Sequence, residues 1–264
     1  MKQISQSQIQ DFQFCHRKYY LAHVRRLAWP APITPSFRKM EENMRQGKAF
    51  HLFVHRYLQN ILPENGQPVD PAIQKWVDNF KAHHPLPAKA QIFTEKEVTT
   101  VLGDTIWIGD FDVLAVQPDR IQIFDWKTSE KPGDPLRLKN SPQTRLYLFL
   151  LLKNLNRFTR SRLNAENLEM IYWYPNAPLA SVRIAYSNEK AQQDESYLQR
   201  ISAQLSSDQA EDYLETDDRQ KCSYCRYQKF CYPETVFDLE DAADPDIDWE
   251  LPETMLETED FYAD

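Results

Sequence analysis

The stretch from Ile121 to Ser129, Ile-Gln-Ile-Phe-Asp-Trp-Lys-Thr-Ser, constrains the fold of this chain more than any other. Its apolar residues predict a buried β-strand, in which successive side chains point to opposite faces. Asp125 and Lys127 therefore emerge on the same face, at the end of an apolar run. Buried charges are costly unless they are paired or bind a cation. The pattern fits either a partly buried ion pair or a metal ligand beside a catalytic amine.

Two segments before it, at about 91–102 and 105–116, are rich in Ile, Val, Thr, Phe and Trp and also predict strands. Tight-turn signals lie between the three segments, so we expect an antiparallel meander. Asp110 and Asp112 share one face of the middle strand. Two neighbouring strands would then deliver carboxylates at an equivalent depth, which an ordinary apolar core avoids.

Helices and further strands are predicted around this meander. A helix at about 37–62 carries His51 beside an apolar stripe, and a helix from Ser141 to about Phe158 begins with a Ser-Pro start signal. Gln143 and Tyr147 lie four residues apart, on one face of its first turns, where a phosphate is well accommodated. His51 could equally be a hydrogen-bonded core residue, and Gln143 and Tyr147 could merely cap and pack. The remaining predicted elements are a first helix from Ser5 or Ser7, a short helix at 71–82, strands at 168–174 and 180–186, and a helix at 188–205.

The four cysteines form a split pattern, Cys15 and then Cys222-x2-Cys225-x5-Cys231. In a cytoplasmic protein such a cluster favours metal binding over disulfides. Cys15 taken alone is consistent with a small buried side chain. Four thiolates suit a tetrahedral Zn2+ or a [4Fe-4S] cluster, and the spacing does not decide between them.

The charge of the chain is unevenly distributed. Of its 39 acidic residues, 12 lie in 238–264, where there is no Lys or Arg, so the rest carries 31 basic and 27 acidic residues, a net charge of +4. We expect a folded domain over 1–237 and a disordered acidic tail over 238–264. The basic body is compatible with a nucleic-acid partner. No long apolar run is present, so we expect a soluble cytoplasmic protein with no membrane partner.

Taken together, these residues resemble the PD-(D/E)XK nuclease superfamily, specifically its RecB/AddB/Cas4-like branch with a four-cysteine iron-sulfur cluster. The likeness covers roughly residues 5–233 and consists of five motifs in order. They are Gly47-x3-His51, Gly109-Asp110-Phe111-Asp112, Asp125-Trp126-Lys127, Gln143-x3-Tyr147 and the split cysteines. His16 follows the first cysteine where that branch commonly has proline.

The resemblance implies an α/β fold with a PD-(D/E)XK restriction-endonuclease-like core, a mixed sheet with an antiparallel meander flanked by helices. The four-cysteine cluster would join its N-terminal and C-terminal segments. Asp112, Asp125, His51 and the carbonyl of Trp126 would hold Mg2+ or Mn2+, with Asp112 preferred to Asp110. Lys127 would activate water or stabilise charge, and Gln143 and Tyr147 would position the strand. Cys15, Cys222, Cys225 and Cys231 would bind a [4Fe-4S] cluster, with Zn2+ as the alternative.

The function implied is a metal-dependent deoxyribonuclease, exonuclease-like and directed to single strands or free ends, in DNA repair, recombination or defence. A helicase or integrase would be its protein partner. Two alternatives stay open. One is a non-catalytic iron-sulfur module that binds nucleic acid, and the other is a Cas4-type nuclease of CRISPR adaptation.

Overall fold

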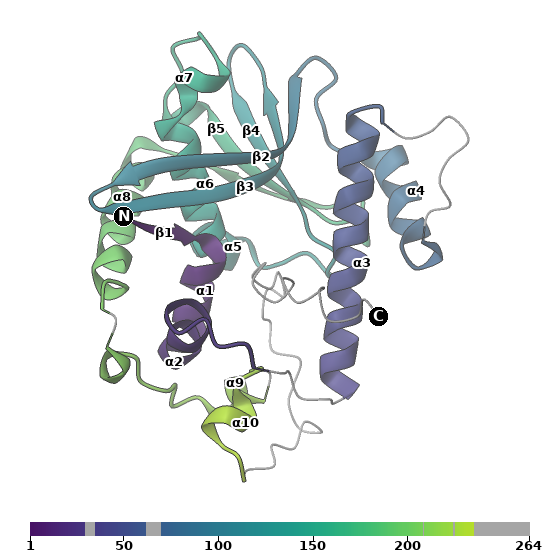
Figure 1. The fold of residues 1–264 in the computed structure, drawn as a ribbon. Helices are drawn as coiled ribbons and strands as arrows, with labels where there is room; N and C mark the ends of the chain where they lie inside the picture. Colours follow the sequence, from purple (N-terminus) through teal and green to yellow (C-terminus); the bar gives the residue numbers. More distant parts are fainter. Residues whose placement is uncertain (30–34, 62–69, 208, 224, 235–264) are drawn as a thin grey trace. The chain divides into compact units, whose positions relative to one another are not determined.

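The computed structural model describes residues 1–29, 35–61, 70–207, 209–223 and 225–234 (Figure 1). The chain divides into two compact units. Unit 1 comprises Met1–Gln6 and Gln46–Ala203, and unit 2 comprises Ser7–Arg45 and the part from Gln204 onward. The predicted acidic tail at 238–264 and the boundary before it lie outside the described residues.

A six-stranded mixed sheet forms the centre of unit 1. The antiparallel meander predicted from the sequence is present, because β3 pairs antiparallel with both β2 and β4. β5 then pairs parallel with β4, β6 antiparallel with β5, and β1 parallel with β3. The strands are β1 (Lys2–Ser5), β2 (Gln91–Leu102), β3 (Thr105–Val116), β4 (Ile121–Trp126), β5 (Leu168–Trp173) and β6 (Ser181–Ala185).

Helices cover both faces of this sheet. On one face, Phe124 and Trp126 of β4 join a buried cluster with Phe50 of α3 and Phe80 of α4. On the other face, Asp125 of β4 contacts α6. The alternation of side chains along β4 thus assigns the two helical layers to opposite faces. Helix α3 (Pro35–Leu58) belongs to this unit from Gln46 onward. The other helices of the unit are α4 (Gln74–His83), α5 (Pro135–Asn140), α6 (Pro142–Lys153), α7 (Leu155–Phe158) and α8 (Asn188–Gln204).

The N-terminus of α6 forms as the sequence predicts. The Ser141 hydroxyl accepts a hydrogen bond from the Thr144 N–H at 3.2 Å, and Pro142 occupies the first turn. Burial of α6 is extensive, since eight of its residues are buried, Gln143 and Tyr147 among them. The site residues on α6 are therefore held by both a cap and a packed core.

The first helix begins directly after Ser5, as predicted, whereas other local features were not foreseen. The segment from Lys2 to Ser5 is a strand that the sequence did not indicate, and Ile4 is buried within it. The segment between Lys127 and Ser141, for which no element was predicted, contains α5, whose N-terminus is capped by Asp134 and begins with Pro135. The long helix expected up to Phe158 is interrupted at Asn154, whose side-chain amide donates to the carbonyls of Leu150 and Thr99.

Unit 2 consists of short helices and connecting segments. The first helix ends at Phe14, and Cys15 adopts an extended conformation before α2. Tyr213 is buried and stacks on Tyr20, with ring centroids 5.4 Å apart. The Arg17 N–H donates to the Leu214 carbonyl at 3.1 Å, so the early and late segments pack directly. Its helices are α1 (Gln6–Phe14), α2 (His16–Tyr19), a π-helix (Tyr20–Val24), a 3-10 turn (Ala210–Asp212), α9 (Arg219–Cys222) and α10 (Gln228–Cys231).

Lys18 of unit 2 is a buried cation, paired with an equally buried Asp11. Its Nζ lies 2.6 Å from Asp11 Oδ1, and His23 Nε2 lies 2.8 Å from Asp11 Oδ2. Burial alone would raise the pKa of Asp11, but Lys18 and His23 outweigh it and hold that pKa below its usual range. The Asp11 carboxylate thus stays ionised and offsets the buried charge of Lys18.

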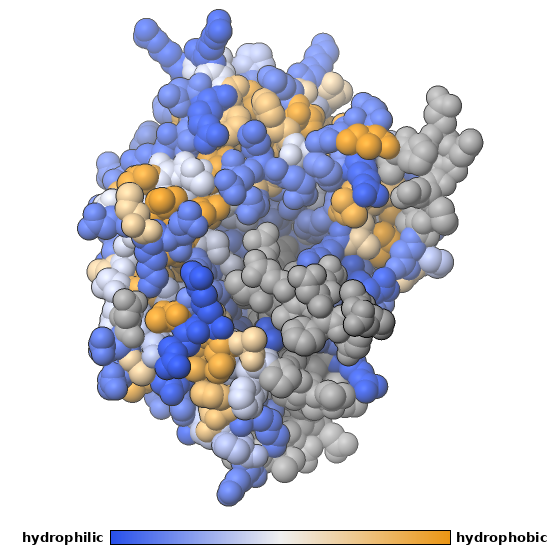
Figure 2. All heavy atoms as spheres, in the orientation of Figure 1, coloured by the Kyte–Doolittle hydropathy of each residue, from blue (hydrophilic) through white to orange (hydrophobic). Residues whose placement is uncertain are grey.

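The exterior is mixed in character. Figure 2 shows a largely hydrophilic face on which apolar residues are scattered in small groups. Among the described helices, none has both the length and the apolar character to cross a membrane.

Gly109→Ala is expected to destabilise the protein by about 1–3 kcal/mol, the cost of overpacking a core. A Cβ at this position would lie 2.8 Å from Leu150 Cδ1 and 2.9 Å from Tyr147 Cε1, so these two buried side chains would have to shift. Urea unfolding measures the change. The matched control is Gly47→Ala, where the Cβ would meet only Thr128 Oγ1 at 3.4 Å and a helical Ala is intrinsically better than Gly. Equal stability of the two variants would contradict this packing.

Asp11→Asn is expected to destabilise by about 3–5 kcal/mol, because it leaves the Lys18 ammonium buried without its partner. Since the folded pKa of Asp11 is depressed, its contribution is fully present above the unfolded pKa of about 3.9 and is lost as the pH falls below that value. Thermal unfolding as a function of pH measures both effects. The variant should approach the wild type in acid, and a constant difference at every pH would contradict the assignment.

Candidate active site

Asp112 stands at an irregularity in β3. It is paired in none of the ladders of that strand, although Phe111 pairs with Lys96 and Val113 pairs with both Thr94 and Phe124. Its carboxylate instead accepts a hydrogen bond from the Trp126 N–H at 2.9 Å, through Oδ2. The side chain thus takes the place of a backbone acceptor where β3 and β4 separate. This leaves the second oxygen, Oδ1, directed to other partners.

His51 reaches the same place from α3. Its Nε2 lies 2.9 Å from the Trp126 carbonyl oxygen, and its Nδ1 lies 3.3 Å from Asp112 Oδ1. A carbonyl oxygen can only accept, so Nε2 must carry the proton of that hydrogen bond. In the neutral ring, Nδ1 therefore presents a lone pair towards Asp112. An imidazole fixed through its other nitrogen by a carbonyl is the usual arrangement of a metal-binding histidine.

Glu95 of β2 completes a cluster that the sequence analysis missed. One ligand atom each from His51, Glu95 and Asp112 lie within 4.8 Å of one another. The Glu95 side chain is exposed, whereas His51 and Asp112 are half-buried. Nothing in the local sequence Thr-Glu-Lys-Glu-Val marks this glutamate, because charged residues are common on an exposed strand.

Asp125, near the end of β4, and Lys127, directly after it, form a buried ion pair. Lys127 Nζ lies 3.0 Å from Asp125 Oδ2 and donates to Gln143 Oε1 at 3.0 Å. The amide of Gln143 in turn donates to Asp125 Oδ1 at 2.6 Å. Gln143 thus links the carboxylate and the ammonium, and all three side chains are buried.

Tyr172 of β5 extends this network, and it too was not anticipated. Its ring lies beneath Lys127, with Nζ 5.4 Å from the centroid, and its hydroxyl is 2.7 Å from Thr144 Oγ1. Tyr147, by contrast, packs against Phe111 with ring centroids 5.0 Å apart. The structure therefore brings Gln143 to the ion pair and places the Tyr147 ring in the core beneath β3.

Electrostatics distinguish the two acids. Burial would raise the pKa of Asp112, but His51 and the Trp126 N–H outweigh it and hold that pKa below its usual range. Burial raises the pKa of Asp125 to about 6, although Lys127 opposes the shift. Asp112 also contributes to this rise, so the two carboxylates interact. Asp112 is thus the firmly ionised acid of the pair.

Together these groups can hold a cation and act beside it. Carboxylate oxygens suit hard divalent cations, and an imidazole nitrogen shifts the preference towards Mn2+. His51 and Asp112 fall in the ligand cluster, whereas Asp125 does not join it. The Trp126 carbonyl accepts from His51, so it orients a ligand. The direct metal-binding roles predicted for Asp125 and Trp126 stay predictions.

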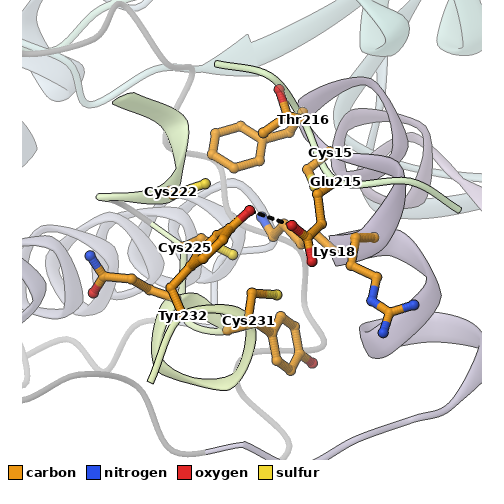
Figure 3. A pocket seen from close by; sticks show the side chains of 12 residues that line it. Cys15, Lys18, Glu215, Thr216, Cys222, Cys225, Cys231 and Tyr232 are labelled. Carbon is orange, nitrogen blue, oxygen red and sulfur yellow. Dashed lines mark hydrogen bonds between the residues drawn. The ribbon is translucent and has the colours of Figure 1, made fainter. Parts of the chain in front are cut away.

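The four cysteines line one pocket in unit 2 (Figure 3). All four are free thiols, contributed by the α1–α2 junction, α9, the segment after it and α10. Burial raises the pKa of Cys225 to about 12, although Lys18 opposes it, and burial raises the pKa of Cys231 to about 11. Thiols in this environment would need a bound metal to ionise at neutral pH. The pocket also contains Glu215 and Tyr232, which hydrogen-bond to each other.

Comparisons with known proteins assign a family. The model described as "PD-(D/E)XK nuclease superfamily" matches residues 3–107 and 103–232. The search of curated proteins finds no match.

Solved structures resemble this chain at low identity. The structure named "Putative exonuclease" from Eubacterium rectale is 11% identical, with 90% of each chain covered and a TM-score of 0.50, which shows a shared fold. The structure named SSO0001 is 16% identical over 89% of this chain and 88% of its own, with a TM-score of 0.41.

The protonation of His51 can be tested directly. At an alkaline pH that leaves the ring neutral, 15N NMR of the histidine side chains should show Nε2 protonated and Nδ1 unprotonated. The spectrum of His51→Gln identifies the resonances among those of the six histidines. The reverse tautomer would contradict the hydrogen bond to the Trp126 carbonyl.

Proposed function

Since this chain belongs to the PD-(D/E)XK nuclease superfamily, we propose that it is a metal-dependent deoxyribonuclease that hydrolyses DNA phosphodiester bonds. One observation carries the proposal. His51 Nδ1 lies 3.3 Å from a carboxylate oxygen of Asp112, so the two side chains converge on one point. Lys127 follows β4 directly, one residue beyond Trp126, whose backbone bonds both His51 and Asp112.

The residues at this site fit a divalent cation. The approach of His51 Nδ1 to Asp112 Oδ1 requires either a proton on the nitrogen or a cation between the two atoms. A bound Mg2+ or Mn2+ would neutralise charge on the scissile phosphate and lower the pKa of a bound water. The family motifs also indicate Asp125 and the Trp126 carbonyl as ligands; the carbonyl accepts a hydrogen bond from His51, and Asp125 pairs with Lys127.

Lys127 supplies a fixed positive charge for the reaction. Its stem is buried, and Asp125 and Gln143 hold its ammonium at 3.0 Å each. A charge held in advance in a buried site stabilises developing negative charge without further reorganisation. Gln143 acts as a positioning residue, because it fixes both members of the ion pair. Tyr147, packed beneath β3, would act on the DNA strand only through the position of its hydroxyl.

The finer assignment follows the motifs. The order of the motifs and the cysteine pattern support a RecB- or Cas4-like nuclease, exonuclease-like and acting on single strands or free ends. Such an enzyme would serve DNA repair, recombination or defence with a helicase or integrase partner. The exposed basic residues Arg25 and Arg26 in unit 2 offer contacts for phosphates, and salt should weaken them.

We further propose that the four cysteines bind a [4Fe-4S] cluster. A tetrahedral Zn2+ with Zn–S bonds of about 2.3 Å needs its sulfurs about 3.8 Å apart. The four cysteines line one pocket, which suits either metal, and the order of the family motifs favours the iron-sulfur cluster. The nearby Lys18 ammonium would partly offset the charge of the thiolates.

Cleavage of labelled single-stranded DNA in Mn2+ or Mg2+ tests the nuclease. Lys127→Met keeps the buried stem and removes the charge, and Asp112→Asn keeps the shape of the ligand. Each should reduce the rate by about 100-fold or more, the usual cost of losing one preorganised charge. The control is Asp110→Asn, an exposed residue two positions away that pairs with Glu97, and it should cleave as the wild type does.

Circular dichroism confirms that each variant is folded. If the wild-type protein binds DNA but leaves it intact in both metals, the catalytic proposal is wrong. A non-catalytic binding module would then be the better description.

Anaerobic purification tests the cluster. The wild-type protein should show a broad absorption shoulder in the blue region, with iron and sulfide in equal amounts. Cys225→Ser should lose the colour and about 2–5 kcal/mol of stability, as when a structural cross-link is removed. Ser223→Ala, a buried neighbour in the same segment, should keep the colour. A colourless wild-type protein with stoichiometric zinc would overturn the assignment.

A further inference from the structure

We propose that Glu95 is a third protein ligand of the divalent cation held by His51 and Asp112. The inference rests on the proposed function and extends it, because none of the family motifs quoted above contains this glutamate. The observation behind it is geometric: one ligand atom of each of the three side chains lies within 4.8 Å of the other two. Ligand atoms around one divalent ion are separated by about this distance or less.

The backbone of Glu95 is arranged for this position. Thr94 pairs with Val113 and Lys96 pairs with Phe111, so Glu95 lies opposite Asp112, yet these two residues form no ladder pair. Glu95 has φ of 46°, in the left-handed region. This conformation costs a non-glycine residue about 1–2 kcal/mol. Backbone strain of this kind is concentrated at functional sites. A role of the Glu95 side chain as a metal ligand would therefore explain why a strained residue stands within the 12-residue strand β2.

The consequence of this irregularity is that β2 and β3 deliver carboxylates to one place. In an uninterrupted ladder both strands would use their backbone groups for pairing at this level. Here Glu95 of β2 and Asp112 of β3 are not paired with each other. The Asp112 carboxylate instead accepts a hydrogen bond from the Trp126 N–H. Glu95 meets the resulting site from its exposed side, while His51 meets it from α3.

Charge balance favours the same assignment. The Asp125 carboxylate is already paired with the Lys127 ammonium at 3.0 Å, so that pair contributes no net charge. With a neutral His51, the carboxylates of Glu95 and Asp112 supply two negative charges, which match a divalent cation. One nitrogen and two oxygens leave coordination positions open for a water and a phosphate oxygen, as a hydrolytic site requires.

Direct binding of Mn2+ tests the inference without reference to cleavage. The full chain is purified anaerobically and titrated with Mn2+, and the signal of free Mn2+ is followed by electron paramagnetic resonance. Glu95→Gln preserves the size of the side chain and removes its charge. We expect this variant to bind Mn2+ about tenfold more weakly or worse. Losing a residue that only orients a ligand already lowers metal affinity by about tenfold, and losing a ligand should cost at least as much.

The matched control is Glu97→Gln. Glu97 is an exposed carboxylate on the same strand, two residues away, and it pairs in register with Asp110. It should bind Mn2+ as the wild type does. A general electrostatic effect of removing one acid would weaken both variants equally, and that result would overturn the assignment of Glu95 as a ligand.

The outcomes separate this inference from the proposed function. If Glu95→Gln binds Mn2+ as tightly as wild type while Asp112→Asn has lost binding and cleavage, the role of Glu95 is wrong and the nuclease stands. If the wild-type protein neither binds Mn2+ nor cleaves DNA, both proposals fail. Selective loss of Mn2+ affinity in Glu95→Gln supports the ligand.

Discussion

The backbone of Trp126 is the feature on which the rest of the site depends. Its N–H donates to Asp112 of β3, and its carbonyl accepts from His51 of α3, each at 2.9 Å. Two side chains from distant parts of the sequence are thus oriented by the two backbone groups of one residue. Because the Trp126 ring is itself buried in the cluster between the sheet and helices α3 and α4, these backbone groups have little freedom. The core thereby fixes the geometry of the ligands.

The ion pair of Asp125 and Lys127 differs in burial from the neighbouring side chains of Asp112 and His51. On the side of α6, the pair formed by Asp125 and Lys127 is enclosed by Gln143 and Tyr172, and every partner is buried. Burial of an ion pair seldom stabilises a fold more than an apolar pair of the same shape would. The role of the pair is therefore to hold the Lys127 ammonium in a fixed position rather than to stabilise the fold. Beside it, Asp112 and His51 remain half-buried, as a site that must admit water and a phosphate requires.

Much of this arrangement could be predicted from the sequence. Alternation placed Asp125 and Lys127 on one face, and turn signals gave the meander with nearly correct strand boundaries. Glu95 could not be found this way, because its position depends on a left-handed backbone conformation that no glycine or asparagine marks. The strand β1 was missed because four residues carry too little periodicity, and its pairing with β3 is a long-range contact. Gln143 could be singled out from the start of its helix, but its contacts with Asp125 and Lys127 depend on how α6 packs.

The central claim is that His51 Nδ1 and the Asp112 carboxylate share one divalent ion. A crystal of the wild-type protein soaked in Mn2+ tests this most directly, through the anomalous scattering of manganese. The account predicts a single strong peak in contact with both His51 Nδ1 and an Asp112 oxygen, with His51 Nε2 still bonded to the Trp126 carbonyl. A well-ordered site without a peak between these two side chains, or a manganese ion bound elsewhere in unit 1, would contradict it.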